Sequence, residues 1–201
     1  MGDVIAYESG KGLYINLTNR CPCDCEFCIR KKSEGINAQE SLWLTKDPSY
    51  NEVIEAIDEK GIDNYEELVF CGFGEPTERL DILLEVAKYI KEKRPVYPIR
   101  INTNGLSDLV NGRSTASEFS GLIDSVSISL NATCKEDYLR VCHPKFGIES
   151  YDALKQFAVK CKDYVRDVCF TVIDSLSDND IRECQRVCDE LGIRLRVRSS
   201  L

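Results

Sequence analysis

Leu13-Tyr-Ile-Asn-Leu-Thr18 alternates apolar and polar residues as a β-strand does, and it leads almost directly into Cys21-Pro-Cys-Asp-Cys-Glu-Phe-Cys28. Cys21, Cys25 and Cys28 have the spacing C-x-x-x-C-x-x-C. Three thiolates placed in this way can hold one face of an iron–sulfur cube and leave the fourth iron without a protein ligand. The stretch therefore predicts a strand whose carboxyl end carries an iron–sulfur site.

The rest of the chain alternates β-rich runs with segments of helical period, which is typical of a parallel α/β sheet. Five further strands are predicted over Glu67–Cys71, Ile99–Thr103, Ser125–Asn131, Asp167–Ile173 and Ile193–Arg198. Helices are predicted over Asn51–Lys60, Arg79–Lys93, Tyr151–Lys162 and from Ile181 to Leu191, with the weakest pattern over Thr115–Leu122. We therefore expect one α/β domain over residues 1–201, with an N-terminal extension over residues 1–12 and a cysteine loop over residues 20–30.

Several predicted strands have one apolar face and one polar face. The polar faces carry Asn102 and Asn104 in the third strand, Ser127, Ser129 and Asn131 in the fourth, and Arg194, Arg196 and Arg198 in the sixth. If the apolar faces pack on the helices, the polar faces line a wet or ligand-filled hollow. The pattern favours a six-stranded (β/α)₆ partial TIM barrel, and the alternative is an open sheet with one solvated face.

Length and composition narrow the class of protein. The chain has 201 residues, 11 cysteines and a net charge of −8. An odd number of cysteines in a long chain whose start shows no apolar signal segment indicates a reduced, cytoplasmic protein. The negative charge argues against a general affinity for nucleic acid or anionic lipid. No stretch approaches roughly 18 consecutive apolar residues, so we expect no membrane span.

Unusual residues gather where the predicted strands end, which is where ligands bind in folds of this kind. The second strand ends in Cys71-Gly-Phe-Gly-Glu-Pro-Thr77, the third in Asn102-Thr-Asn-Gly105 and the fourth in Ser129-Leu-Asn131. Gly72 and Gly74 would let the backbone approach a ligand closely. An ordinary turn into a helix also needs glycine, so for Gly105 both interpretations remain open.

Together these motifs resemble the radical S-adenosylmethionine (radical SAM) superfamily. The resemblance lies in the cysteine spacing with Phe27 before the last cysteine, in Gly72-Phe-Gly-Glu-Pro76 and in Thr103-Asn-Gly105. It spans nearly the whole chain, because six βα units make up that superfamily's core. Leu13-Tyr-Ile-Asn-Leu-Thr-Asn-Arg-Cys21 and Val69-Phe-Cys-Gly-Phe-Gly-Glu-Pro-Thr77 are most similar to small radical enzymes found associated with TatD-type hydrolases.

The resemblance implies a [4Fe–4S] cluster on Cys21, Cys25 and Cys28, whose open iron would bind the amino and carboxylate groups of S-adenosylmethionine (SAM). It also implies cofactor contacts by Phe27 beside the adenine, by the segment Gly72, Phe73, Gly74 and Glu75 at the methionine ammonium, and by Ser127, Ser129 and Asn131 at the ribose. Asn102 and Asn104 are further cofactor-binding candidates. The family's usual Gly-Gly-Glu reads Phe73-Gly74-Glu75 here, which is similar to the Gly-x-Gly-Glu-Pro of radical methylases.

Arg196 and Arg198 are candidates of another kind, because guanidinium groups inside a barrel require anionic partners. The methionine carboxylate, Asp174 or an anionic substrate would each serve. The alternative is that arginines on an edge strand guard against intermolecular pairing.

As a radical SAM enzyme, the chain would cleave SAM reductively and abstract hydrogen from an unidentified substrate, such as a peptide, a protein or a nucleic-acid element. A low-potential electron donor of the ferredoxin or flavodoxin type and a functional link to a TatD-type hydrolase are the expected partners. Two alternatives stay open: an activase that installs a glycyl radical on a protein partner, and an iron–sulfur or zinc binding protein without turnover. Cys23 is expected to take no part in the cluster, and Cys71 and Cys142 are the other candidates for a functional thiol.

Overall fold

The computed structural model describes residues 3–31 and 41–199, and within them it forms one sheet of seven strands. The strands are β1 (Ala6–Ser9), β2 (Gly12–Ile15), β3 (Glu67–Phe70), β4 (Ile99–Thr103), β5 (Ser125–Ser129), β6 (Asp167–Ile173) and β7 (Arg194–Arg198). They lie side by side in chain order, with β1 antiparallel to β2 and every later pair parallel. No pairing joins β7 to β1 within the described residues, so the sheet stays open, as expected for a partial barrel.

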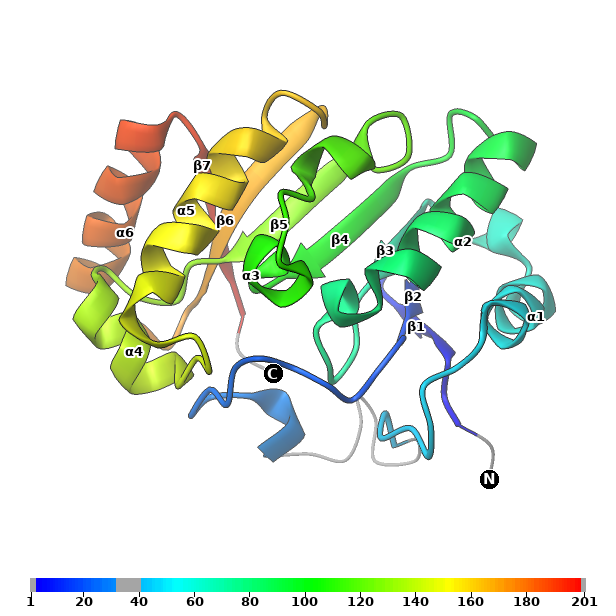
Figure 1. Ribbon diagram of the computed structural model, residues 1–201, viewed down its shortest axis with the longest axis horizontal. Coiled ribbons are helices and arrows are strands. Elements are labelled where there is room, and N and C mark those ends of the chain that lie inside the picture. The colour runs from blue at the N-terminus through cyan, green and yellow to red at the C-terminus, as the bar shows by residue number, and fades with distance from the viewer. Residues whose placement is uncertain (1–2, 32–40, 200–201) are drawn as a thin grey trace.

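The α-helices follow the parallel strands, and Figure 1 shows α2, α3 and α5 in front of the sheet. The α-helices are α1 (Tyr50–Lys60), α2 (Leu80–Lys93), α3 (Ser107–Asn111), α4 (Lys135–Cys142), α5 (Ser150–Cys161) and α6 (Asp178–Leu191). Short 3₁₀ helices are η1 (Ile29–Lys31), η2 (Ile62–Asn64), η3 (Pro76–Arg79), η4 (Ala116–Phe119) and η5 (Gly147–Glu149). No helix in the described part of the chain is long and apolar enough to cross a membrane.

The faces of the strands divide as predicted. Ile99, Ile101, Val126 and Ile128 are completely buried in the main core, which the helices share. Burial of such side chains is the dominant favourable contribution to folding, at about 1.5–3 kcal/mol for each large one. The alternate residues of the same strands therefore face the other side of the sheet, the inside of the partial barrel.

The predicted N-terminal extension is in part a strand of the sheet. β1 and β2 form a hairpin in which Ser9 pairs with Gly12, and Gly10 adopts a left-handed φ of 58° in the turn between them. The signal was present in the sequence as the two-residue turn Gly10-Lys11 between runs of β-forming residues.

Two local features differ from the predictions. Thr115–Leu122 forms only the short 3₁₀ turn η4. Conversely, α4 was not predicted, although Glu136 and Asp137 in its first turn and Pro144 beyond its end are the usual signals of a helix start and stop. Helix α4 proves central to the site.

Candidate active site

The cysteine loop follows β2 and ends in η1 at the lower edge of the view in Figure 1. Cys21, Cys25 and Cys28 are partly exposed, whereas Cys23 is only 4% exposed. The Cys23 thiol instead faces the buried Tyr138 hydroxyl of α4 at 3.9 Å. Cys23 also lies within hydrogen-bonding reach of Cys21 and Cys25, so its expected absence from the cluster stays a prediction.

Backbone hydrogen bonds connect this loop to the end of α4 and to the residues just after it. The Asp24 and Glu26 amides donate to the carbonyls of Cys142 and Val141 at 3.0 and 2.9 Å, and the Lys145 amide donates to the Pro22 carbonyl at 2.8 Å. The loop is thus shaped by a segment far away in the sequence.

Hydrogen bonds from neighbouring thiols favour the thiolate form, which is the form that binds metal. The Cys142 thiol donates to Cys25 and lowers the pKa of Cys25 to about 4. A hydrogen bond from Cys23 likewise lowers the pKa of Cys21, and the Arg30 guanidinium acts in the same direction on both. Burial raises the pKa of Cys28.

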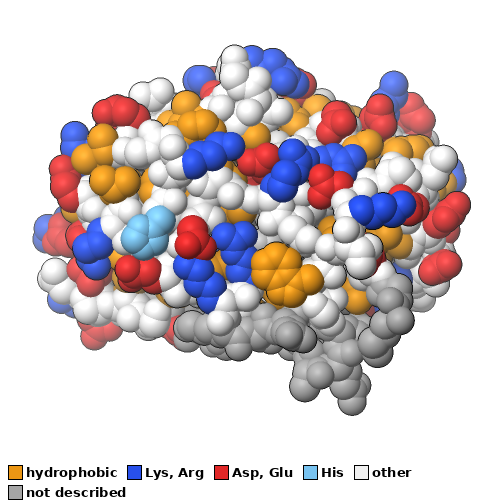
Figure 2. Space-filling model, turned by 60° about the horizontal axis from the view of Figure 1, so that its bottom comes forward, with side chains coloured by type: hydrophobic (Ala, Val, Ile, Leu, Met, Phe, Trp, Pro, Cys, Tyr) orange, Lys and Arg blue, Asp and Glu red, His pale blue; other side chains and the backbone are white. Residues whose placement is uncertain are grey.

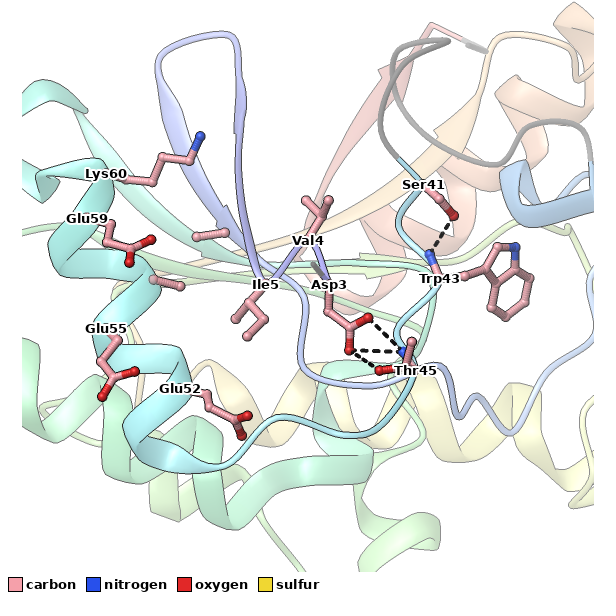
Figure 3. A pocket seen from close by; sticks show the side chains of 12 residues that line it. Asp3, Val4, Ile5, Ser41, Trp43, Thr45, Glu52, Glu55, Glu59 and Lys60 are labelled. Atoms are coloured by element: carbon pink, nitrogen blue, oxygen red, sulfur yellow. Dashed lines mark hydrogen bonds between the residues drawn. The ribbon is translucent and has the colours of Figure 1, made fainter. Parts of the chain in front are cut away.

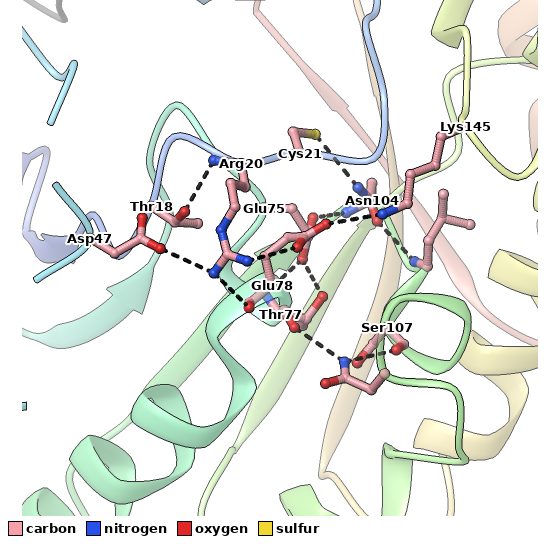
Figure 4. Close-up of polar contacts among 12 residues, drawn as sticks. Thr18, Arg20, Cys21, Asp47, Glu75, Thr77, Glu78, Asn104, Ser107 and Lys145 are labelled. Carbon is pink, nitrogen blue, oxygen red and sulfur yellow. Dashed lines mark hydrogen bonds and ion pairs between the residues drawn. The ribbon is translucent and has the colours of Figure 1, made fainter. Parts of the chain in front are cut away.

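The buried carboxylate of Glu75 links the segment after β3 to the end of β4 (Figure 4). Glu75 accepts hydrogen bonds from the hydroxyls of Thr77 and Thr103 at 2.8 and 2.7 Å and from the amides of Thr77 and Asn104 at 3.2 and 2.7 Å. Burial is the main cause of its raised pKa. The carboxylate is therefore occupied within the protein, and only the backbone of this segment is available to a cofactor.

Asn104 is fixed by the same network, with its side chain directed at Cys21. The Asn104 Oδ1 atom accepts from the Leu106 amide at 2.9 Å, so Nδ2 is left to face the Cys21 sulfur at 3.8 Å. Of the predicted site residues, Asn104 is thus brought directly to a cluster cysteine.

The two glycines of the β3 loop serve close packing inside the protein. A Cβ atom on Gly74 would lie 2.2 Å from the Thr18 carbonyl oxygen and 2.6 Å from that of Arg20, and the Glu75 amide donates to the latter at 2.8 Å. A Cβ atom on Gly72 would lie 2.0 Å from Asn16 Oδ1. The side of Gly74 on which a Cβ would stand therefore packs against the chain at Thr18 and Arg20, and the expected approach of its backbone to the methionine group stays a prediction.

The inward faces of β4 to β7 form a polar wall. Arg100, paired with Glu67 at 2.6 Å, also donates to Asn102 Oδ1 at 2.7 Å, so Asn102 is held by its own neighbour. The Ser127 hydroxyl lies 3.4 Å from the Cys169 sulfur and accepts from Arg196 at 3.2 Å.

Asn131 links the end of β5 to the end of α4. Asn131 has a left-handed φ of 61°, its Nδ2 atom donates to Cys142 Sγ at 3.8 Å, and its Oδ1 atom is buried without a partner.

Comparison with known families settles what this arrangement is. The model of the radical SAM superfamily matches residues 15–191 of the chain. The chain belongs to the radical SAM superfamily. Members are enzymes that use a [4Fe–4S] cluster and SAM, and this radical SAM protein is one of them.

Two solved structures are similar to this radical SAM enzyme, both at low identity, so the likeness shows the fold. A radical SAM methyltransferase from Sphaerobacter thermophilus is 14% identical with a TM-score of 0.62, and the match covers 96% of this chain and 68% of that one. TsrM from Kitasatospora setae, a radical SAM methyltransferase with cobalamin and a [4Fe–4S] cluster bound, is 10% identical with a TM-score of 0.55, and the match covers 92% and 36% of the two chains. A comparison with curated proteins found no match.

The residues present fit the family's cofactors. Three partly exposed thiols on one short loop, two of them favoured as thiolates, are the donor set that a cluster with one open iron requires. In the described ranges no three Cys, His, Asp or Glu side chains converge on a single-ion site. Thiolates of a cube bind different irons, so they need not converge on one point. The Asn131 Oδ1 atom after β5 is buried without a hydrogen-bond donor. A cofactor hydroxyl bound at this strand end would fit there as the donor.

Phe73 has a structural role in this radical SAM enzyme. Its side chain is 4% exposed and packs with Tyr7 and Leu42 in a second apolar cluster, with the Trp43 ring edge-on at 5.2 Å between centroids. Phe73 therefore fills the β1 side of the barrel with its side chain, and the expected contact of its backbone with the methionine ammonium stays a prediction. Phe27 packs partly buried against the main core.

A surface pocket of about 610 Å³ lies between α1 and the chain at residues 3–6 and 41–45 (Figure 3). Glu52, Glu55 and Glu59 of α1 line it on one side and Asp3 and Trp43 on the other. None of the predicted cofactor contacts lines it.

Residues that sequence reasoning missed lie mostly in α4 and beside the loop. Tyr138 covers Cys23, and Arg30 donates to the Cys23 carbonyl at 3.0 Å. Figure 2 shows basic and acidic side chains interspersed over the described part of the face it presents, rather than a continuous basic surface.

Proposed function

We propose that this radical SAM enzyme holds its [4Fe–4S] cluster on Cys21, Cys25 and Cys28 and uses SAM to abstract hydrogen from a substrate. The observation that carries the proposal is the contact of two of the three thiols with polar groups at the ends of β4 and α4: the Asn104 amide faces the Cys21 sulfur at 3.8 Å, and the Cys142 thiol lowers the pKa of Cys25. A loop that merely bound a structural ion would not need ordered donors from the ends of β4 and α4.

When bound, the cluster and SAM supply one-electron cleavage of a carbon–sulfur bond and hydrogen abstraction by the resulting adenosyl radical. The residues of the chain bind and orient the cluster and SAM. Asn104 and Cys142 direct polar hydrogens at the ligand sulfurs, which stabilises negative charge there. Glu75 keeps the β3 and β4 loops together, so the backbone at Gly72–Glu75 is fixed beside the cysteine loop.

The substrate, the subgroup and the partners are further parts of the proposal. The open sheet supports a substrate that itself helps to close the site, such as a peptide, a protein or a nucleic-acid element. The sequence similarity of the strand–cysteine stretch supports membership of the TatD-associated subgroup and a functional link to a TatD-type hydrolase. A ferredoxin or flavodoxin would supply the electron, since this chemistry needs a low-potential donor.

The test is anaerobic reconstitution with iron and sulfide, followed by reduction with dithionite and measurement of 5′-deoxyadenosine formed from SAM. The parent protein should form it. Cys25→Ala should bind little iron and form none, while Cys23→Ala, a matched control in the same loop, should keep both properties. Absence of 5′-deoxyadenosine from a fully loaded parent protein would refute the proposed function.

A further inference from the structure

We propose that Arg196 and Arg198 of β7 form a binding site for a carboxylate or phosphate group of the substrate, inside the open side of the barrel. The substrate assignment rests on the proposed function, whereas the oxyanion site itself rests on contacts of β7.

The arginines of β7 have different surroundings, although they alternate along one face. Arg194 forms a two-point ion pair with Asp167, at 3.0 Å from Nε and 2.6 Å from Nη2, and its side chain is 52% exposed. Arg196 donates from Nη2 to the Ser127 hydroxyl at 3.2 Å. The Nε atoms of Arg196 and Arg198 are both buried without a hydrogen-bond partner.

Edge protection does not account for these positions. Inward-pointing charges are among the devices that guard an edge strand, but that role does not explain why the Nε atoms of Arg196 and Arg198 are buried without a hydrogen-bond partner. Here burial is the main cause that lowers the pKa of Arg198, whereas Val197, on the opposite face of the strand, is 46% exposed. The cations thus point into the protein while an apolar neighbour points out.

The depth of Arg196 favours a ligand other than the methionine carboxylate, whereas Arg198 is the last residue of β7 and lies level with Ile173 at the end of β6. Ser127, the partner of Arg196, lies two residues before the end of β5, in register with Asn102 and Cys169. Arg198 lies within electrostatic reach of Tyr14 of β2 and Cys71 at the end of β3, on the far side of the hollow. The cysteine loop, to which the methionine group must bind, lies beyond the strand ends.

The chemistry identifies the class of ligand. A guanidinium presents parallel N–H donors that match two oxygens of a carboxylate or phosphate. Two such groups, with the Ser127 hydroxyl beside one of them, favour an oxyanion over a neutral group.

The probes for the test are inorganic phosphate and succinate, titrated into the anaerobically reconstituted holoenzyme in the presence and absence of saturating SAM. Binding is measured by calorimetry and by the rise in unfolding temperature. Arg196→Gln and Arg198→Gln are compared with Arg194→Gln, the matched control whose guanidinium is engaged by Asp167 at the surface. Arg198→Lys keeps the positive charge but lacks the parallel N–H donors of a guanidinium. The helical signal in circular dichroism and the iron content check that each variant is folded.

We expect the parent to bind at least one probe with SAM present, because the two ligands occupy different places. Arg196→Gln and Arg198→Gln should weaken this binding about tenfold or more, since they remove one partner of a desolvated charge pair. Arg198→Lys should recover part of the affinity, and Arg194→Gln should change it by less than about twofold.

Two results would overturn the assignment. One is a parent that binds neither probe, or whose binding survives both glutamine substitutions. The other is competition between SAM and the probes together with weaker SAM binding in the variants, which would show that the arginines hold the methionine carboxylate. Failure of 5′-deoxyadenosine formation in the parent would refute the proposed function and leave the probe measurements to decide the oxyanion site on their own.

Discussion

Replacing Gly74 by alanine should dislodge the cysteine loop as well as weaken SAM binding. The added Cβ would lie 2.2 Å from the Thr18 carbonyl oxygen and 2.6 Å from that of Arg20, where ordinary contact begins near 3.4 Å. Both obstacles are backbone atoms, so the two segments must separate by about 1 Å to restore normal contact. That movement would break the 2.8 Å hydrogen bond from the Glu75 amide to the Arg20 carbonyl.

Overpacking and the lost hydrogen bond together should cost about 2–4 kcal/mol in the free energy of unfolding. For a chain of this size the unfolding temperature would fall by about 5–15 °C. Because the displaced carbonyls lie immediately before Cys21, iron and sulfide content after reconstitution should fall to less than about half.

Gly12→Ala is the matched control, because its Cβ would meet side-chain atoms rather than backbone: Tyr14 Cε2 at 3.0 Å, and Glu67 Cγ and Val69 Cγ2 at 3.4 Å. It should keep the parent's iron content and most of its stability. The assay is thermal unfolding of the apo protein, followed by iron, sulfide and SAM-binding measurements on the reconstituted protein. A stable, fully loaded Gly74→Ala variant with weak SAM binding would refute the packing argument and restore a direct role of Gly74 at the methionine group.

Three other outcomes are expected. Cys25→Ala should lose the cluster, and Cys23→Ala should retain it, as iron analysis and electron paramagnetic resonance will show; equal loss in both would contradict the assignment of ligands. Asn104→Leu should lower the midpoint potential of the cluster by about 20–60 mV, since one N–H···S bond of about 0.5–1.5 kcal/mol is removed from the reduced form; an unchanged potential in a spectroelectrochemical titration would exclude the contact. Glu75→Gln should lower the free energy of unfolding by about 1–3 kcal/mol, because an amide nitrogen replaces an oxygen that accepts a backbone N–H group. If denaturant unfolding gives this variant the same stability as the parent, the network is dispensable.

Much of the fold was predictable because strand and helix periods are local properties. Ile99–Thr103 and Asp167–Ile173 have the predicted bounds, and the division into polar and apolar faces is confirmed by the burial of Ile101 and Val126. The partial barrel followed from that division. Missed elements, such as β1 and α4, are short, so few residues show a period.

The site was harder to predict, because its contacts join distant segments. The sequence placed Asn104 near the cofactor, but only the structure shows that Glu75 and Leu106 orient its amide toward Cys21. Likewise, the sequence predicts that Gly74 lets the backbone approach a ligand, but only the structure shows that a Cβ at this position would meet the carbonyls of Thr18 and Arg20. The residue type indicates which groups can pack closely against a position, and the tertiary structure determines which group is actually there.

The long-range support of the cysteine loop implies an order of events during synthesis. Cys23 is separated from its partner Tyr138 by 115 residues, and the backbone bonds to Val141 and Cys142 span a similar length. At about 5–20 residues per second, a ribosome would need roughly 6–23 s to make the segment that shapes the loop after the cysteines have been made. During this interval the four thiols are part of an unsupported chain, open to stray metal ions and oxidants. We therefore expect stable cluster insertion on this loop to follow the synthesis and docking of α4.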